Sequence, residues 1–191
     1  MEKTYIEEKH FEQTDFSLEP LPGRDYEDCV FNNCNFSNTN LTSVNFTGCK
    51  FNGCNMTMAN LTKTAFRDCT FKDCKLLGLH FNHCHEFGLS VAFENCILNL
   101  ASFYKSKLKN TKFTSSSLHE ADFAEANLNG AVFANCDLAG ASFDNTNLEK
   151  ADLRTAYNYT INPETNRIKK AKFSVSGIAG LLTKYDIVVS E

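Results

Sequence analysis

The chain has 191 residues, of which 42% are hydrophobic, so it is long enough for one domain with a sizeable core. Its formal net charge of −4 at pH 7 argues against a general nucleic-acid or phosphate binder. No apolar run approaches the roughly 18 residues of a membrane span, and the charged N-terminus is unlike a signal peptide, so we expect a cytoplasmic protein.

Large apolar residues recur at every fifth position between residues 26 and 81, and a small residue usually precedes each of them by two positions. Neither an α-helix, with about 3.6 residues per repeat, nor a strand, with about 2, has this period. The members of this first series are Tyr26, Phe31, Phe36, Leu41, Phe46, Phe51, Met56, Leu61, Phe66, Phe71, Leu76 and Phe81. The period indicates a repeat architecture.

The spacing within each unit predicts its geometry. In an extended segment, positions two apart point to the same side, so the small and the large residue both face inward. The next inward pair begins three residues later, so the chain has to turn between units. Cys29, Cys49 and Cys69 recur at every fourth unit, which predicts four units per coil and a square cross-section. We expect the nine cysteines to be reduced core fillers.

The repeat fails between Phe81 and Phe93, which are two residues further apart than two complete units would place them. The stretch "HCHEFGLSVAF" therefore carries a two-residue insertion, and we expect a loop that leaves the rod. A second departure, "LEPLPGRDY" near the N-terminus, is also expected to form such a loop. The histidines and the cysteine of the first stretch alternate between outward and inward positions, so we expect no metal site. The candidate loop contacts are His85, Glu86, Phe87, Gly88 and Leu89.

The second series of large residues runs from Phe93 to Leu153. Its outward positions between residues 117 and 153 contain seven acids against Lys150 alone. Acidic outward positions can simply keep a rod soluble, or they can face a basic partner. The candidate partner-facing acids are Glu120, Asp122, Glu125, Asp137, Asp144, Glu149 and Asp152.

After Leu153 the repeat disappears, so we divide the chain into a repeat domain (1–155, with a register break near 82–92) and a tail (156–191). The tail is expected to contain the last coil and a cap, with a short helix around 175–182 and a short strand from Tyr185 to Val189. It could cover the open end of the rod or join two rods around a two-fold axis. The candidate dimer interface is Ile178, Leu181, Leu182, Tyr185, Ile187 and Val188.

The units "ADFAE", "ANLNG" and "CDLAG" resemble the A(D/N)LXX repeat of the pentapeptide-repeat family. That resemblance implies an all-β fold, a right-handed quadrilateral parallel β-helix, here with a short C-terminal helix-plus-strand tail. It covers about residues 9–155.

Within the family, the chain is similar to the topoisomerase-protecting branch, which includes the Qnr quinolone-resistance proteins and the microcin and albicidin immunity proteins. The stretches "FKDCKLLGLHF", "FENCILNLASFY" and "INPETNRIKKAKFSVSGIAGLL" carry this similarity. It implies a DNA-mimicking homodimer in the bacterial cytoplasm that binds DNA gyrase, and in some members topoisomerase IV, and protects the enzyme from poisons of the quinolone, albicidin or microcin type. The short central break is nearer the immunity proteins than the long-looped Qnr members.

The sequence contains no nucleophile–base arrangement, Gly-rich phosphate loop or paired-carboxylate cleft. We therefore expect no enzymatic activity, cofactor, metal or small-molecule substrate, and no direct contact with nucleic acid or membrane. The alternative is a structural or scaffolding rod that binds a protein other than a topoisomerase.

Overall fold

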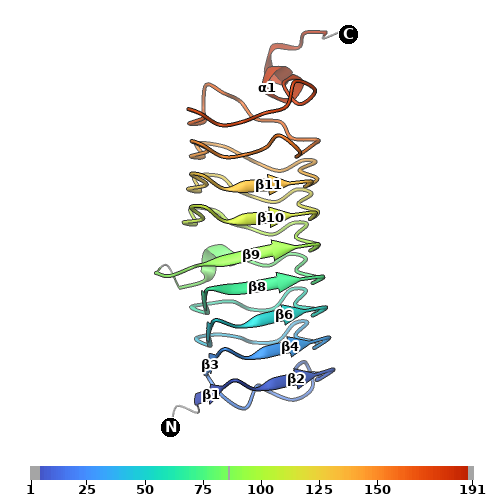
Figure 1. Ribbon diagram of the computed structural model, residues 1–191, viewed down its shortest axis with the longest axis vertical. Coiled ribbons are helices and arrows are strands. Elements are labelled where there is room, and N and C mark those ends of the chain that lie inside the picture. The colour runs from blue at the N-terminus through green and yellow to red at the C-terminus, as the bar shows by residue number, and fades with distance from the viewer. Residues whose placement is uncertain (1–4, 86, 189–191) are drawn as a thin grey trace.

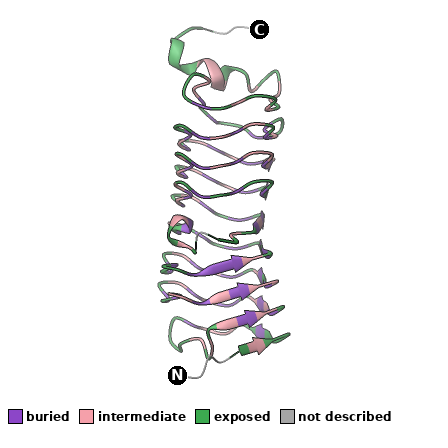
Figure 2. Cartoon of the chain, turned by 90° about the vertical axis from the view of Figure 1, so that its left-hand side faces the viewer, coloured by how far each residue is buried: buried purple, intermediate pink, exposed green. Residues whose placement is uncertain are grey.

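The structure is a computed structural model that describes residues 5–85 and 87–188. The chain winds into a stack of short coils with the two termini at opposite ends of a rod (Figure 1). The inward residues form a continuous buried column along its axis, whereas the C-terminal tail is largely exposed (Figure 2). The predicted parallel β-solenoid is confirmed.

Two adjacent sides of the rod carry parallel sheets, in which each strand pairs with the strand one coil away. The first side consists, in spatial order, of β1 (Tyr5–Glu7), β3 (Asp25–Glu27), β5 (Asn45–Thr47) and β7 (Ala65–Arg67). The second side consists of β2 (His10–Glu12), β4 (Val30–Asn32), β6 (Lys50–Asn52), β8 (Cys69–Lys72), β9 (Val91–Glu94), β10 (Lys112–Thr114) and β11 (Val132–Ala134). The third and fourth sides are joined between coils by single bridges.

The coil length follows from the pairing register. Phe31 pairs with Phe11 in one neighbouring coil and with Phe51 in the other, so each coil consists of four five-residue units. The rings of this column stack at centroid distances of 4.8 and 4.9 Å, close to the usual spacing of paired strands. Rings of neighbouring columns meet edge to face, as Phe46 and Phe51 do at 5.3 Å. Such aromatic contacts add to the stabilisation from burial.

Most corners contain a residue in the left-handed conformation, two positions after the large inward residue. Asn33 and Asn38 have φ values of +52° and +55°, and Gly48 has +64°. Asn, Asp and Gly tolerate this conformation better than other residues, which explains their frequency at this position. Gly48 is further constrained, because a Cβ atom there would meet the Asp28 carboxylate at 2.1 Å.

The small inward position has a hydrogen-bonding role that the spacing alone did not reveal. The Thr64 hydroxyl donates to the Leu41 carbonyl at 2.7 Å, and the Cys34 thiol donates to the Phe11 carbonyl at 3.5 Å. In both cases the acceptor lies 23 residues earlier, in the preceding coil. Eight of the nine cysteines are buried, and Cys84 is partly exposed. Burial raises the pKa of the Cys69 thiol well above its usual range, as expected for a core filler.

The predicted register break lies where the repeat fails. Phe71 pairs with Phe93, whereas an unbroken register would pair it with Val91, so this coil contains two extra residues. The chain leaves the fourth side through the 3-10 helix η1 (Phe81–His83), and the segment that follows projects from the rod near β9 (Figure 1).

The expected loop at "LEPLPGRDY" is different, because this coil keeps the four-unit register between Ile6 and Tyr26. Leu21 packs against the core. The stretch therefore forms the fourth side of the first coil and leads into β3, and it is not an inserted loop.

The tail contains one short helix, α1 (Ala179–Leu182), followed by the 3-10 helix η2 (Thr183–Tyr185). The expected strand is not formed in the described residues, because Tyr185 ends η2 and Asp186 has a left-handed φ of +50°. Residues 186–188 have no regular structure, and Val189 lies outside the described residues. Within the described chain, no helix has the length and apolar character needed to cross a membrane.

Candidate functional site

The seven candidate acids do not share one face of the rod. Asp122 lies in the fourth-side bridge column, Asp144 follows the inward Phe143 of the same side, and Glu120 and Glu125 lie at its two corners. The other three lie on different sides: Asp137 on the third, Glu149 on the first and Asp152 on the second. The structure therefore gathers four of the acids around the fourth side and separates the rest.

Four of the seven acids are close to a basic side chain. Arg154 Nη2 lies 2.7 Å from Asp152 Oδ2, and its hydrogen bonds hold the pKa of that carboxyl below its usual range. The remaining distances are 3.0 Å for Arg167–Glu149, 3.4 Å for Lys105–Glu125 and 2.8 Å for His119–Asp137.

Glu120, Asp122 and Asp144 have no such ion pair within the described part of the chain. Asp122 is held in place by the Ala124 N–H, which donates to its Oδ1 at 2.9 Å, and by the Ser102 hydroxyl at 3.3 Å from Oδ2. Glu120 and Asp144 are exposed. These three define the fourth-side acidic patch: Glu120, Asp122 and Asp144.

A second concentration of acids lies at the N-terminal end of the first side. Glu7 and Glu27 are directly opposite each other in β1 and β3, and Asp25 is on the same strand as Glu27. Like charges in opposed positions destabilise a sheet, so this arrangement has a cost. The Tyr5 hydroxyl offsets part of it by donating to Glu27 Oε2 at 2.7 Å. The acid count of this segment was visible in the sequence, but the stacking needed the register between coils. We call Glu7, Asp25 and Glu27 the N-terminal acidic patch.

The projecting loop runs from η1 on the fourth side to β9 on the second side. Phe87 is 69% exposed and points away from the core, with Lys107 Nζ 5.5 Å from its ring centroid. Leu89 instead packs against the core. Gly88 has a φ of +85° and passes close to Arg67, where a Cβ atom would lie 3.3 Å from Arg67 Nε. His85 is exposed, and Glu86 lies outside the described residues.

The tail packs on the last coil and also leaves apolar side chains in solvent. The Ile161 N–H donates to the Gly180 carbonyl at 2.9 Å, and the Tyr185 hydroxyl donates to Glu164 at 2.8 Å. Leu181 contacts the core. The exposed members of the predicted interface are Ile178, Tyr185, Ile187 and Val188, whereas Leu181 and Leu182 are half-buried. Val175, also in the tail, is 90% exposed and was not among the predicted residues.

The described residues contain no group of three His, Cys, Asp or Glu side chains that could hold a metal ion. This includes the neighbourhood of the stacked rings of His80 and His83, whose centroids are 5.0 Å apart.

Two family models match the chain: a pentapeptide repeat region over residues 89–159, and pentapeptide repeats in eight copies over residues 27–57. No curated protein matches it.

One similar solved structure is that of HetL, a pentapeptide repeat protein involved in heterocyst differentiation regulation from the cyanobacterium Nostoc sp. strain PCC 7120. Its sequence is 16% identical to this chain and its TM-score is 0.51, and the match covers 92% of this chain and 90% of HetL. QnrB1, a plasmid-mediated fluoroquinolone resistance protein, is 19% identical with a TM-score of 0.44, covering 97% of this chain and 99% of QnrB1. At these identities the likeness concerns the fold alone.

Proposed function

The chain belongs to the pentapeptide-repeat family, and we propose that it is a non-catalytic, DNA-mimicking member that binds DNA gyrase, with topoisomerase IV as a related target. It would protect the enzyme from an antibiotic or toxin of the quinolone, albicidin or microcin type. The observation that carries the proposal is the placement of the fourth-side acidic patch, the Phe87 loop and the N-terminal acidic patch along two adjoining sides of the rod.

The acids support recognition of a basic surface. A surface that binds duplex DNA is lined with Lys and Arg side chains, which an acidic rod can contact in place of phosphates. The fourth-side acidic patch is in the C-terminal half, and the N-terminal acidic patch is at the opposite end on the neighbouring side. A groove of the partner protein that surrounds the corner between the fourth and first sides of the rod would contact both patches. The rod would then compete with nucleic acid and would not bind it.

The loop supports an apolar anchor between the two acidic patches. Phe87 is the exposed aromatic side chain of the projecting loop, and isolated aromatic side chains often dominate the energy of an interface. Lys107 Nζ lies 5.5 Å from the centroid of the Phe87 ring. A partner pocket that accepts Phe87 would fix the axial position of the rod, which stacked acids alone cannot do.

The tail supports assembly of two rods. Its exposed apolar side chains lie at the C-terminal end, and a two-fold interface there would place the two rods end to end. Val188 is 96% exposed and Ile187 lies beside it. A homodimer of this kind would double the length of acidic surface without any new acidic residue.

The test is a gyrase supercoiling assay in the presence of a fluoroquinolone, albicidin or a microcin. The purified protein is expected to restore supercoiling with at least one of the three. The variant Glu120→Gln/Asp122→Asn/Asp144→Asn should need about tenfold more protein for the same rescue. The matched control Asp137→Asn/Glu149→Gln/Asp152→Asn removes the same number of charges from the other sides and should be closer to the natural chain. The proposal fails if no inhibitor is countered and gyrase is not bound at low salt.

A second candidate function is a scaffolding rod that binds another protein, and an apolar strip on the third side favours it. The strip consists of Met58, Leu77, Ile97 and Leu100, whose large side chains are exposed at outward positions of consecutive coils. Met58 lies across Gly78, where a Cβ atom would be 2.6 Å from its sulfur. Recovery of a partner without gyrase subunits, and its loss in Leu100→Ser, would support this function.

A further inference from the structure

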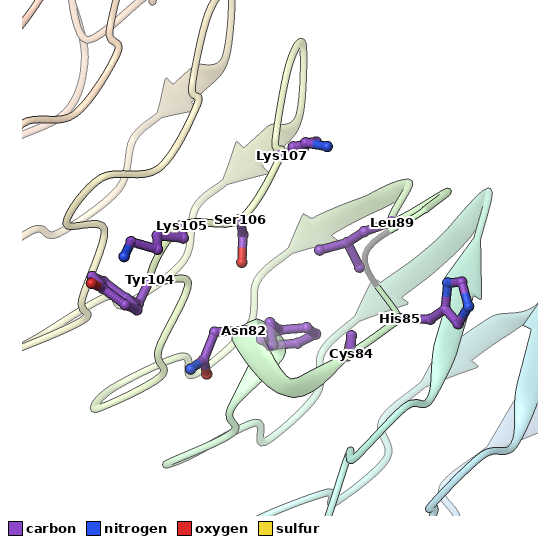
Figure 3. Close-up of a pocket in the computed structure, with 9 residues that line it drawn as sticks. Asn82, Cys84, His85, Leu89, Tyr104, Lys105, Ser106 and Lys107 are labelled. Carbon is purple, nitrogen blue, oxygen red and sulfur yellow. The ribbon is translucent and has the colours of Figure 1, made fainter.

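The register break leaves a hollow beside the core of the rod. On the first side, large inward side chains occupy successive coils, with Phe66 below the break and Leu108 above it. In the coil of the break, the chain passes through η1 and the projecting loop instead of following that side. The result is a cavity of about 330 Å³ at the junction of the fourth and first sides, with its nine lining residues shown in Figure 3.

The floor of the hollow is apolar, and a buried polar atom without a partner among the described residues lies close to it. Phe81, a core residue stacked on Phe103 at 4.8 Å, and the half-buried Leu89 provide the apolar surface. Asn82 Oδ1 is buried, and none of the described residues donates a hydrogen bond to it. Since this atom is closed off from solvent, it is not part of the surface that an occupant of the hollow would contact.

Ser106 supplies a polar group to the lining of the hollow. It occupies the small inward position at which Thr64 and Thr146 donate to a backbone carbonyl 23 residues earlier. Across the register break the equivalent carbonyl lies 25 residues earlier, as in the bond from the Cys96 thiol to the Phe71 carbonyl. For Ser106 it is the carbonyl of Phe81 at the start of η1, which accepts from the Cys84 N–H at 3.1 Å. Figure 3 shows the Ser106 hydroxyl directed towards η1, into the hollow.

The rim of the hollow is basic. Lys105 and Lys107 both line it, together with Tyr104. Lys105 Nζ lies 3.4 Å from Glu125, but both side chains are largely exposed, and ion pairs of this kind contribute little energy. The Lys105 ammonium group can therefore turn to an anion in the hollow at small cost.

We propose that this hollow is a binding site for a small aromatic anion. The planar body would lie against Phe81 and Leu89, and its carboxylate or sulfonate would face Lys105. The volume of about 330 Å³ is at the small end of the usual range for ligand pockets and suits one or two rings. The site is independent of gyrase binding and needs neither the acidic patches nor the tail.

The probe is 8-anilino-1-naphthalenesulfonate, an aromatic anion with a secondary amine whose fluorescence rises in an apolar site. We expect saturable binding of one molecule per chain. Ser106→Leu should weaken it about tenfold or more by filling the hollow, and the fold accepts Leu at this position because Leu79 occupies the equivalent one. Lys105→Gln should weaken it by about three- to tenfold, whereas the matched control Lys109→Gln, on a lysine outside the hollow, should not.

Competition separates the anion from the aromatic body. 1-Naphthoate is expected to displace the probe at a concentration about tenfold lower than neutral 1-naphthalenemethanol. Ile178→Ser and Leu100→Ser remove apolar surface elsewhere and should leave binding unchanged. Equal displacement by the two competitors, or loss of binding in either surface variant, would overturn the proposal. Unchanged binding in a folded Ser106→Leu would also overturn it; if that variant does not fold, the paired lysine variants and the competition decide.

Discussion

Phe123→Ala is expected to lower the free energy of unfolding by about 3–5 kcal/mol, because it removes a large side chain from the centre of the C-terminal half. Phe123 is completely buried. Its ring stacks between those of Phe103 at 5.0 Å and Phe143 at 5.2 Å, and meets Phe113 and Phe133 edge to face at 5.9 and 5.7 Å. Each aromatic pair contributes about 0.5–1.5 kcal/mol beyond burial, which places the loss near the upper end of the range.

The measurement is urea unfolding followed by circular dichroism, with Ala124→Ser as the control. Ala124 is the next residue along the same unit but points outward, so its substitution should change the unfolding free energy by no more than about 0.5 kcal/mol. The stacked coils leave little room for collapse around the cavity, because both neighbouring rings are held by their own coils. A loss below about 1 kcal/mol for Phe123→Ala would mean that the inward column does not carry the stability of the rod.

Three further outcomes are expected. Ile187→Asp should convert a dimer into monomers in sedimentation experiments without lowering the melting temperature, because Ile187 is exposed in the single chain; an intact dimer would exclude this surface. Phe87→Ala should weaken gyrase binding, measured by surface plasmon resonance, about tenfold or more without changing the stability of the protein. If the acidic side chains alone bound gyrase, the affinity of this variant would equal that of the natural chain. Arg154 lowers the pKa of Asp152, so the native state binds fewer protons there than the unfolded chain, and this stabilisation is present above about pH 4 and lost as the pH falls through the native pKa. Asp152→Asn should therefore be less stable than the natural chain in urea unfolding at neutral pH, and the difference should shrink as the solution is made strongly acidic.

The inward positions of the rod were predictable because burial leaves little choice there. A large apolar residue at every fifth position, with a small one two places before it, is compatible with few structures. The coil length of four units followed from the spacing of Cys29, Cys49 and Cys69, and the pairing of Phe31 with Phe11 and Phe51 agrees with it. The two extra residues at the break were also predictable, because an insertion changes the spacing of the large apolar residues.

The ion pairs were missed although the sequence contained a signal for them. Lys105 and Glu125 are separated by one full coil, and Arg167 and Glu149 by slightly less than one coil. Applying the coil length to outward residues would have paired these groups and shown that several acids are not free. The segments outside the repeat have no constant repeat length from which neighbouring residues could be predicted. The first-coil stretch with Leu21 keeps register despite its Pro and Gly residues, and the expected C-terminal strand fails because no neighbouring strand in the described chain pairs with it.

The division between inward and outward positions also explains how the fold can carry a recognition surface with little loss of stability. Inward residues fix the coil, and outward residues can change charge with effects of only about 0.5 kcal/mol or less on stability. The stacking of Glu7 over Glu27 is an exception, because opposed like charges are unfavourable and the sheet would be more stable with a basic residue in one strand. The first side thus contains an unfavourable pair of carboxylates, although an uncharged polar residue in one strand would keep the surface equally soluble. Glu27→Gln should accordingly raise the melting temperature while weakening gyrase binding; a rise in stability with unchanged binding would assign the N-terminal acidic patch to solubility alone.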